Sequence, residues 1–141
     1  MKVGFGLAGI LLLAAVGLGP LGAGLGGSFD KLSDADRKAF QERFEREVWP
    51  LLLRGGKDGC VGCHDLKGRN APHFSGDAAK DFRALLKEGF FLHDDPGNLV
   101  TRVATKDKKR RMPPGNRPPW PDADVQVLRQ FIADVDKKQQ K

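Results

Sequence analysis

The sequence predicts an all-α domain in which short helices are separated by long loops. Apolar residues recur every three or four positions in several segments, which is the spacing of one face of a helix. No stretch alternates apolar and polar residues convincingly, as a half-buried strand does. Clusters of glycine and proline lie between the helical segments and interrupt them. The chain has 141 residues, a length typical of a single domain.

Residues 1–28 predict a targeting segment rather than a part of this domain. Lys2 is followed by an apolar run rich in small residues, and the next charge is Asp30. This pattern is typical of a secretory signal, and the uncharged stretch is also long enough to span a bilayer if it stays uncut. We therefore expect a signal peptide or an uncleaved N-terminal anchor at 1–28, and the domain at 29–141. The alternative is a buried N-terminal helix.

The charge distribution narrows the classes of partner. The net charge is +6 at pH 7, and basic chains bind nucleic acid, anionic membranes or acidic proteins. The leader predicts an exported protein, periplasmic or anchored on the outer side of the cytoplasmic membrane, and this argues against nucleic acid. Basic and acidic residues are mixed along most of the chain, and the one concentrated run is Lys106–Arg111. That run is either a solvated loop or a docking surface.

The first helix of the domain is predicted to start after Ser33. Ser33 has the side chain of an N-cap, and two aspartates follow it in the first turn. Apolar residues recur at helical spacing from there, namely Phe40, Phe44, Val48 and then Leu51 or Leu52. We expect this helix to reach about Trp49, because Pro50 should kink or interrupt it. Gly55-Gly56 then allows a turn.

Three more helices are predicted in the second half. Asp77 is suited to cap a helix that Gly89 ends, and Asp95-Pro96 to begin a short third helix. The segment from Met112 to Pro119 must be non-helical, and the last helix starts near Pro121 or Asp122. The apolar residues of these helices are Phe82, Leu85 and Leu86, then Leu99, Val100 and Val103, then Val125, Leu128, Phe131, Ile132 and Val135.

The segment Cys60-Val61-Gly62-Cys63-His64 carries the strongest chemical signal. A C-x-x-C-H sequence is typical of the attachment of a c-type haem. Two thiols three positions apart can each reach one vinyl group at the same porphyrin edge, and the adjacent histidine can then bind the iron. The sequence therefore predicts one haem c, held covalently through Cys60 and Cys63, with His64 as an iron ligand. A buried haem would also supplement the few large apolar residues available for a core.

The two cysteines could also have roles other than haem attachment. They could form a redox-active disulfide, although the βαβ pattern of thioredoxin-like proteins is missing. They could hold half of a zinc site, for which His64, His73 and His93 are the remaining candidates. They could also form a simple structural disulfide.

Met112 is the best candidate for the sixth iron ligand. It is the only methionine besides Met1, and it lies in a loop between a basic run and two prolines. A thioether is a soft ligand suited to haem iron, and His/Met ligation raises the reduction potential. The alternatives are a core methionine, or ligation by His73 or His93. Trp120 could cover a haem edge or simply pack.

These residues together resemble the class I monohaem cytochromes c of exported bacterial proteins. The resemblance covers most of the chain after the leader and rests on four segments, namely Val48-Trp49-Pro50-Leu51-Leu52, Cys60–His64, Met112-Pro113-Pro114 and Phe131-Ile132. It implies a cytochrome c-like fold wrapped around the haem, in which the first and last helices pack together and Met112 closes the distal side. It also implies electron transfer to redox partner proteins, with acidic docking faces as the expected partner surface. The alternative is a small peroxidase-like or ligand-binding haem enzyme with a labile sixth ligand.

Overall fold

The computed structural model describes residues 30–55, 59–65, 72–92 and 98–141, and these residues form an all-α fold. Within these ranges the only β-type pairing is an isolated bridge between Asp65 and Phe74. The prediction of an all-α domain is confirmed. The helical segments are α1 (Asp34–Arg43), η1 (Phe44–Val48), α2 (Trp49–Leu53), α3 (Cys60–Cys63), α4 (Ala78–Lys87), α5 (Leu99–Ala104) and α6 (Asp122–Gln139).

The first helical segment runs on through Pro50, and the prediction that it ends near Trp49 is wrong. Helix α1 passes directly into the π-helical segment η1 and then into α2, which ends at Leu53. The Trp49 N–H donates to the carbonyl of Phe44, five residues back. Pro50 then lies in the first turn of α2, where its missing N–H is tolerated. The change of helix type therefore accommodates the proline within a continuous helical path.

Helix boundaries elsewhere follow local capping chemistry. The Ser33 hydroxyl accepts from the Asp36 N–H at 3.1 Å, and the Asp77 carboxylate accepts from the Lys80 N–H at 2.9 Å. Helix α4 gives way to Gly89 at φ +82°, a conformation that favours glycine. The predicted caps of α1 and α4 and the predicted end of α4 are confirmed.

The start of α5 differs from the prediction. Its N-cap is Asn98, whose side-chain oxygen accepts from the Thr101 N–H at 2.8 Å. The predicted cap, Asp95-Pro96, is therefore wrong, and these two residues lie outside the described ones. Asparagine caps helices as well as aspartate does, but the sequence analysis did not identify Asn98 as a cap. The Asn98 side chain also donates to the Leu92 carbonyl at 3.0 Å, which ties the helix start to the preceding segment.

An aromatic cluster lies where η1, α4 and α6 meet. The Phe44 and Phe82 rings are 5.5 Å apart, and those of Phe91 and Phe131 are 5.4 Å apart, measured between ring centroids. All four side chains are fully buried. The predicted apolar stripe of α6 is confirmed, because all of its members are buried, namely Val125, Leu128, Phe131, Ile132 and Val135.

Ion pairs join the first and last helices. Arg43 donates to Asp134 at 2.6 Å, and Lys138 lies 2.9 Å from Asp36. The Arg43 guanidinium holds the pKa of Asp134 below its usual value. Phe40 also meets Phe131 edge-to-face at 6.0 Å. The α1–η1 segment and α6 are thus packed together at the level of Phe131.

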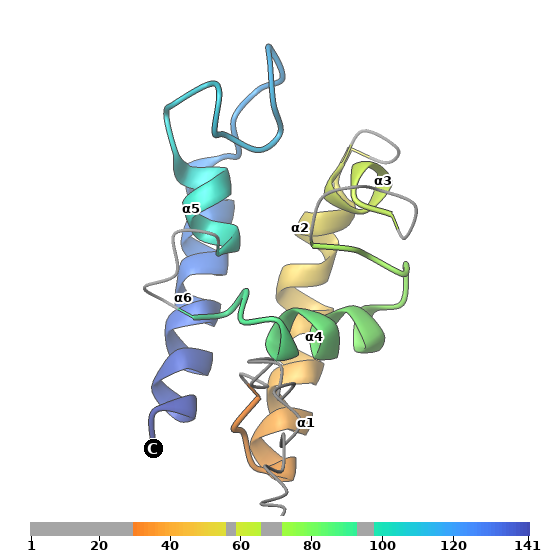
Figure 1. The fold of residues 1–141 in the computed structure, drawn as a ribbon, viewed down its shortest axis with the longest axis vertical. Coiled ribbons are helices and arrows are strands. Elements are labelled where there is room, and N and C mark those ends of the chain that lie inside the picture. Colours follow the sequence, from red (N-terminus) through yellow and green to blue (C-terminus); the bar gives the residue numbers. More distant parts are fainter. Residues whose placement is uncertain (1–29, 56–58, 66–71, 93–97) are drawn as a thin grey trace, which may run out of the picture.

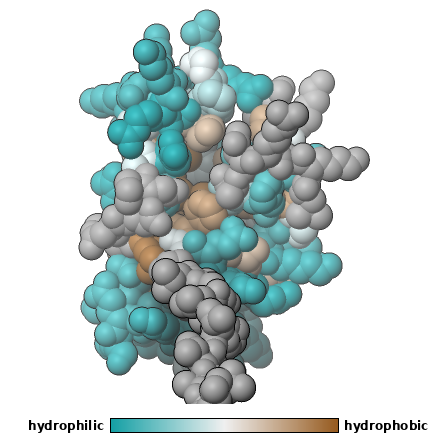
Figure 2. Space-filling model, viewed as in Figure 1, coloured by the Kyte–Doolittle hydropathy of each residue, from teal (hydrophilic) through white to brown (hydrophobic). Residues whose placement is uncertain are grey.

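The opposite end of the molecule carries the residues of chemical interest. Helix α3 and the loop between α5 and α6 lie at the same end of the fold (Figure 1). Hydrophilic side chains gather where this loop projects, and apolar side chains are visible below them (Figure 2). Among the described residues, no helix has the length and apolarity needed to span a membrane. The predicted leader, residues 1–28, lies outside the described residues.

Candidate haem-binding site

The C-x-x-C-H segment forms a single helical turn, α3. The Cys63 N–H donates to the Gly59 carbonyl at 3.1 Å, and the His64 N–H donates to the Cys60 carbonyl at 2.9 Å. Residues three positions apart on a helix share one side, so this turn presents both thiols together. Cys60 is partly buried, and Cys63 is exposed.

His64 is anchored to the core through its backbone. The Phe74 N–H donates to the His64 carbonyl at 2.7 Å, and the Phe74 side chain is buried. The next residue, Ser75, donates through its N–H and its hydroxyl to the buried Asp81 carboxylate of α4, at 2.7 and 2.6 Å. Gly76 adds a third bond to that carboxylate at 3.2 Å. His64 is therefore linked to α4 through the segment Phe74–Gly76.

Met112 lies in the non-helical segment between α5 and α6, as predicted. Its N–H donates to the Arg102 carbonyl of α5 at 2.8 Å. Its side chain is partly buried and packs against the hydrophobic core, as Cys60, Val61 and Trp120 also do. Helix α5 thus positions the start of this loop.

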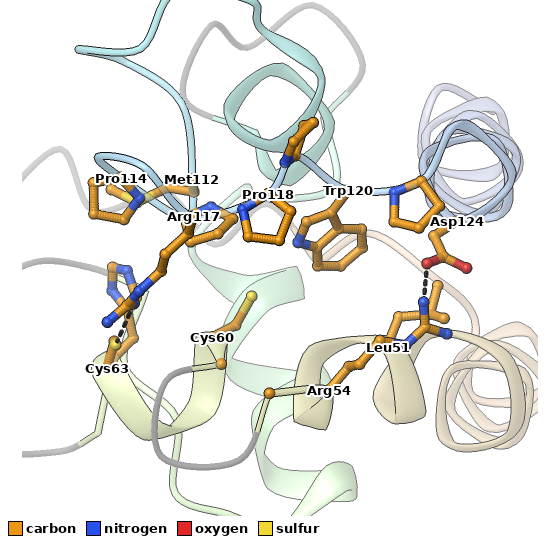
Figure 3. Close-up of a pocket in the computed structure, with 16 residues that line it drawn as sticks. Leu51, Arg54, Cys60, Cys63, Met112, Pro114, Arg117, Pro118, Trp120 and Asp124 are labelled. Carbon is orange, nitrogen blue, oxygen red and sulfur yellow. Dashed lines mark hydrogen bonds and ion pairs between the residues drawn. The ribbon is translucent and has the colours of Figure 1, made fainter.

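Met112 lines one pocket of about 620 Å³ together with Cys60, Cys63 and His64. One wall comes from α2, α3 and the residues between them, and the other from the loop between Met112 and Pro121 and the start of α6 (Figure 3). The Cys60 side chain points toward the wall that carries Pro118 and Trp120. The lining residues are Leu51, Arg54, Gly55, Gly59, Cys60, Cys63, His64, Met112, Pro113, Pro114, Arg117, Pro118, Pro119, Trp120, Pro121 and Asp124.

Of the two other histidines, only His73 can be placed relative to this pocket. His73 is absent from the lining set, and its Nδ1 lies 3.4 Å from the Asp65 carbonyl oxygen. His93 lies outside the described residues. Trp120, for which packing and covering a haem edge were equal alternatives, lines the pocket.

Three charged side chains of the pocket were not predicted. Arg54, the residue that follows α2, forms an ion pair with Asp124 of α6, and this pair joins the two walls at one side (Figure 3). The Arg117 Nη1 lies 3.6 Å from the Cys63 Sγ. The positions of Arg54 and Arg117 in the sequence match no motif that includes the cysteines. Tertiary packing brings both side chains to the pocket, so the sequence alone did not predict them. The one available signal for Arg117 was its place in the proline-rich loop after Met112.

The two cysteines are not joined by a disulfide in the structure, and the environment of Cys60 does not favour a thiolate. Burial raises the pKa of Cys60 to about 11. Redox-active C-x-x-C pairs depend on the opposite shift, a lowered thiol pKa, and the fold has no βαβ unit in the described ranges. The part of the chain that the structure describes also contains no group of three or more His, Cys, Asp or Glu side chains able to hold a metal ion. The disulfide-exchange and zinc alternatives thus gain no structural support.

The residues present fit a haem in their chemistry and in the space they surround. The pocket volume falls within the range of roughly 300–1,000 Å³ that is typical of ligand and cofactor pockets. Its lining is mainly apolar, with two thiols, one imidazole and one thioether. These are the groups that attach and ligate a c-type haem. A search of protein-family models, of curated proteins and of solved structures found no match to this chain.

Proposed function

We propose that this chain is an exported class I c-type cytochrome domain that transfers electrons through one covalently bound haem c. One observation carries the proposal: Met112, which is distant in the sequence from Cys60, Cys63 and His64, lines the same apolar pocket as these three residues. Two thiols, an imidazole and a thioether are the groups that attach and ligate a c-type haem. The proposed fold type is accordingly cytochrome c-like.

Each of these side chains has a distinct proposed task. Cys60 and Cys63 hold the haem through thioether bonds, and α3 keeps their sulfur atoms on one side of a helical turn. When a haem is bound, His64 would ligate its iron from the α3 wall, and Met112 would ligate it from the loop wall. The bound haem supplies a centre that takes up and gives up one electron. Trp120 and the prolines of the loop wall exclude water from that centre.

Electron transfer is favoured over catalysis by the pocket residues themselves. Two protein ligands leave no open coordination position for a substrate. Among the described lining residues the only carboxylate is Asp124, which is paired with Arg54. The absorbance spectrum of the oxidised holoprotein tests this directly. We expect the weak far-red band of methionine–iron(III) charge transfer, whereas a high-spin spectrum would favour the enzyme alternative.

The exposure of part of the basic run supports a proposed docking role. Lys106, Lys108, Lys109 and Arg110 are exposed, in the part of the molecule where hydrophilic side chains gather (Figure 2). They stand shortly before Met112, at the start of the loop that forms one wall of the pocket. We propose that these charges steer an acidic redox partner toward the haem edge.

Charge reversal tests this docking role. In a Lys108→Glu, Lys109→Glu variant we expect an intact far-red band, a modestly lower reduction potential and a flatter salt dependence of electron transfer. The potential falls because positive charge near the haem disfavours its oxidised form, and the salt dependence flattens because long-range attraction is lost. Potentiometry and stopped-flow kinetics with an acidic partner measure both. If neither quantity changes, the run is a solvated loop only.

Haem loss is expected to loosen the protein, most strongly at the pocket. The aromatic cluster around Phe44 and Phe131 is held together by contacts between side chains. The two walls of the pocket would both pack against the haem, so they lose these contacts when the haem is absent. We expect apo-protein with reduced helix content and fast amide exchange in α3 and in residues 112–121. Circular dichroism and hydrogen exchange measure this. Near-native helix content with sharp thermal unfolding in the apo form contradicts it.

A further inference from the structure

The structure divides the basic run into an exposed part and one residue that folds back. Lys108, Lys109 and Arg110 are exposed, but Arg111 is partly buried. The Arg111 Nη2 donates to the Gly115 carbonyl at 3.1 Å and to the Arg117 carbonyl at 2.8 Å. Within the described residues its Nε is buried without a hydrogen-bond partner. These two carbonyls of the loop are therefore what holds the guanidinium in this position.

The bridge from Arg111 closes the segment that carries Met112. Residues 111–117 form a ring whose ends are joined by one charged donor, and hydrogen bonds from charged donors are stronger than neutral ones. The Met112 N–H is bonded to the Arg102 carbonyl of α5 at 2.8 Å, so the methionine is fixed on its other side as well. Arg117, held by the same bridge, lies in the pocket wall. Opening of the loop requires the bridge to break.

We propose that Arg111 is a positioning residue for Met112, and that its bridge to the Gly115 and Arg117 carbonyls keeps the methionine sulfur in the pocket against competing ligands. This inference rests on the proposed function. It explains how the sixth position stays closed in a loop that has no helix to hold it. Arg111 thereby decides whether the pocket serves electron transfer only or also admits a small exogenous ligand.

A matched pair of variants isolates the bridge from the charge. Arg111→Gln and Arg110→Gln each remove one positive charge at adjacent positions. The Arg110 side chain is exposed and forms no hydrogen bond or ion pair in the part of the chain that is described. An effect on Met112 displacement that both variants share is therefore electrostatic. A difference between the two variants measures the contribution of the bridge from Arg111 to the Gly115 and Arg117 carbonyls.

The experiment titrates oxidised holoprotein with imidazole and follows loss of the far-red band. In Arg111→Gln we expect half of Met112 to be displaced at an imidazole concentration about ten-fold or more below that needed for the wild type. The reason is that the variant lacks a charge-assisted hydrogen bond. Arg110→Gln should match the wild type. Thermal unfolding of both variants shows that the difference is not a general loss of stability. Equal half-displacement concentrations for the two variants overturn the proposal.

Two further outcomes concern a variant that fails to accumulate and a wild-type protein that lacks the expected haem. If Arg111→Gln does not accumulate, the comparison passes to Arg111→Lys and Arg110→Lys, which keep the charge but lack the planar donor fork. Easier displacement in Arg111→Lys supports the bridge, and equal displacement overturns it. If the wild-type protein binds no covalent haem, the proposed function fails. If it binds haem but shows no far-red band, the assignment of Met112 as a ligand fails. Both results are seen in the wild-type protein before any variant is compared.

Discussion

Replacing both Cys60 and Cys63 by alanine is expected to abolish covalent haem attachment completely. Each thioether bond needs one of the two thiols, and the described residues contain no other cysteine. The double variant should therefore release any haem into acidic organic solvent, and its denatured polypeptide should have the mass of the unmodified chain. Haem staining after denaturing electrophoresis gives the same answer by a second route.

Single substitutions provide the graded control. Cys63→Ala leaves Cys60, which is the partly buried thiol and points into the pocket. We expect this variant to retain haem through one bond at lower yield. Arg117→Gln changes a neighbour of Cys63 Sγ without removing a thiol, and it should keep both bonds. Covalent haem in the double variant contradicts the assignment of the attachment residues.

Substitution of Met112 by alanine is the second change with a large expected effect. Loss of the thioether should remove the far-red band and lower the reduction potential, because His/Met ligation stabilises the reduced iron. We expect a fall on the order of 0.1 V or more, within the roughly 0.8 V range that axial ligands span. Spectroelectrochemistry measures both quantities on the same sample.

Trp120→Phe is the matched control for Met112→Ala. Trp120 lines the same wall of the pocket and also packs against the core, but it offers no iron ligand. This variant should keep the far-red band and shift the potential far less. If Met112→Ala leaves the spectrum unchanged, the sixth ligand is a histidine or water, and the enzyme alternative gains ground.

The parts of the fold that could be predicted are those that local chemistry determines. Ser33 and Asp77 cap their helices through bonds to residues three positions ahead, and the α6 stripe follows directly from helical periodicity. The placement of Cys60 and Cys63 near each other is equally local, because both lie in one turn of helix. Such features need no knowledge of the rest of the chain.

The missed features depend on tertiary context. Pro50 was expected to interrupt its helix, but the π-helical segment before it removes the conflict. Asn98 rather than Asp95 caps α5, since two good capping residues stand close together and packing selects one. Arg111 looked like any member of its basic run, and only the folded loop places its guanidinium against the Gly115 and Arg117 carbonyls. Arg54 and Asp124 meet across the pocket for the same reason.

The most direct test of the central claim is the mass of the wild-type polypeptide after denaturation. The full chain, with its predicted leader, is produced in an export-competent host that has cytochrome maturation machinery. The proposed function predicts a mature polypeptide that carries the added mass of one haem and stains for haem on a denaturing gel. A polypeptide without bound haem, from a host that loads a control c-type cytochrome, would contradict it.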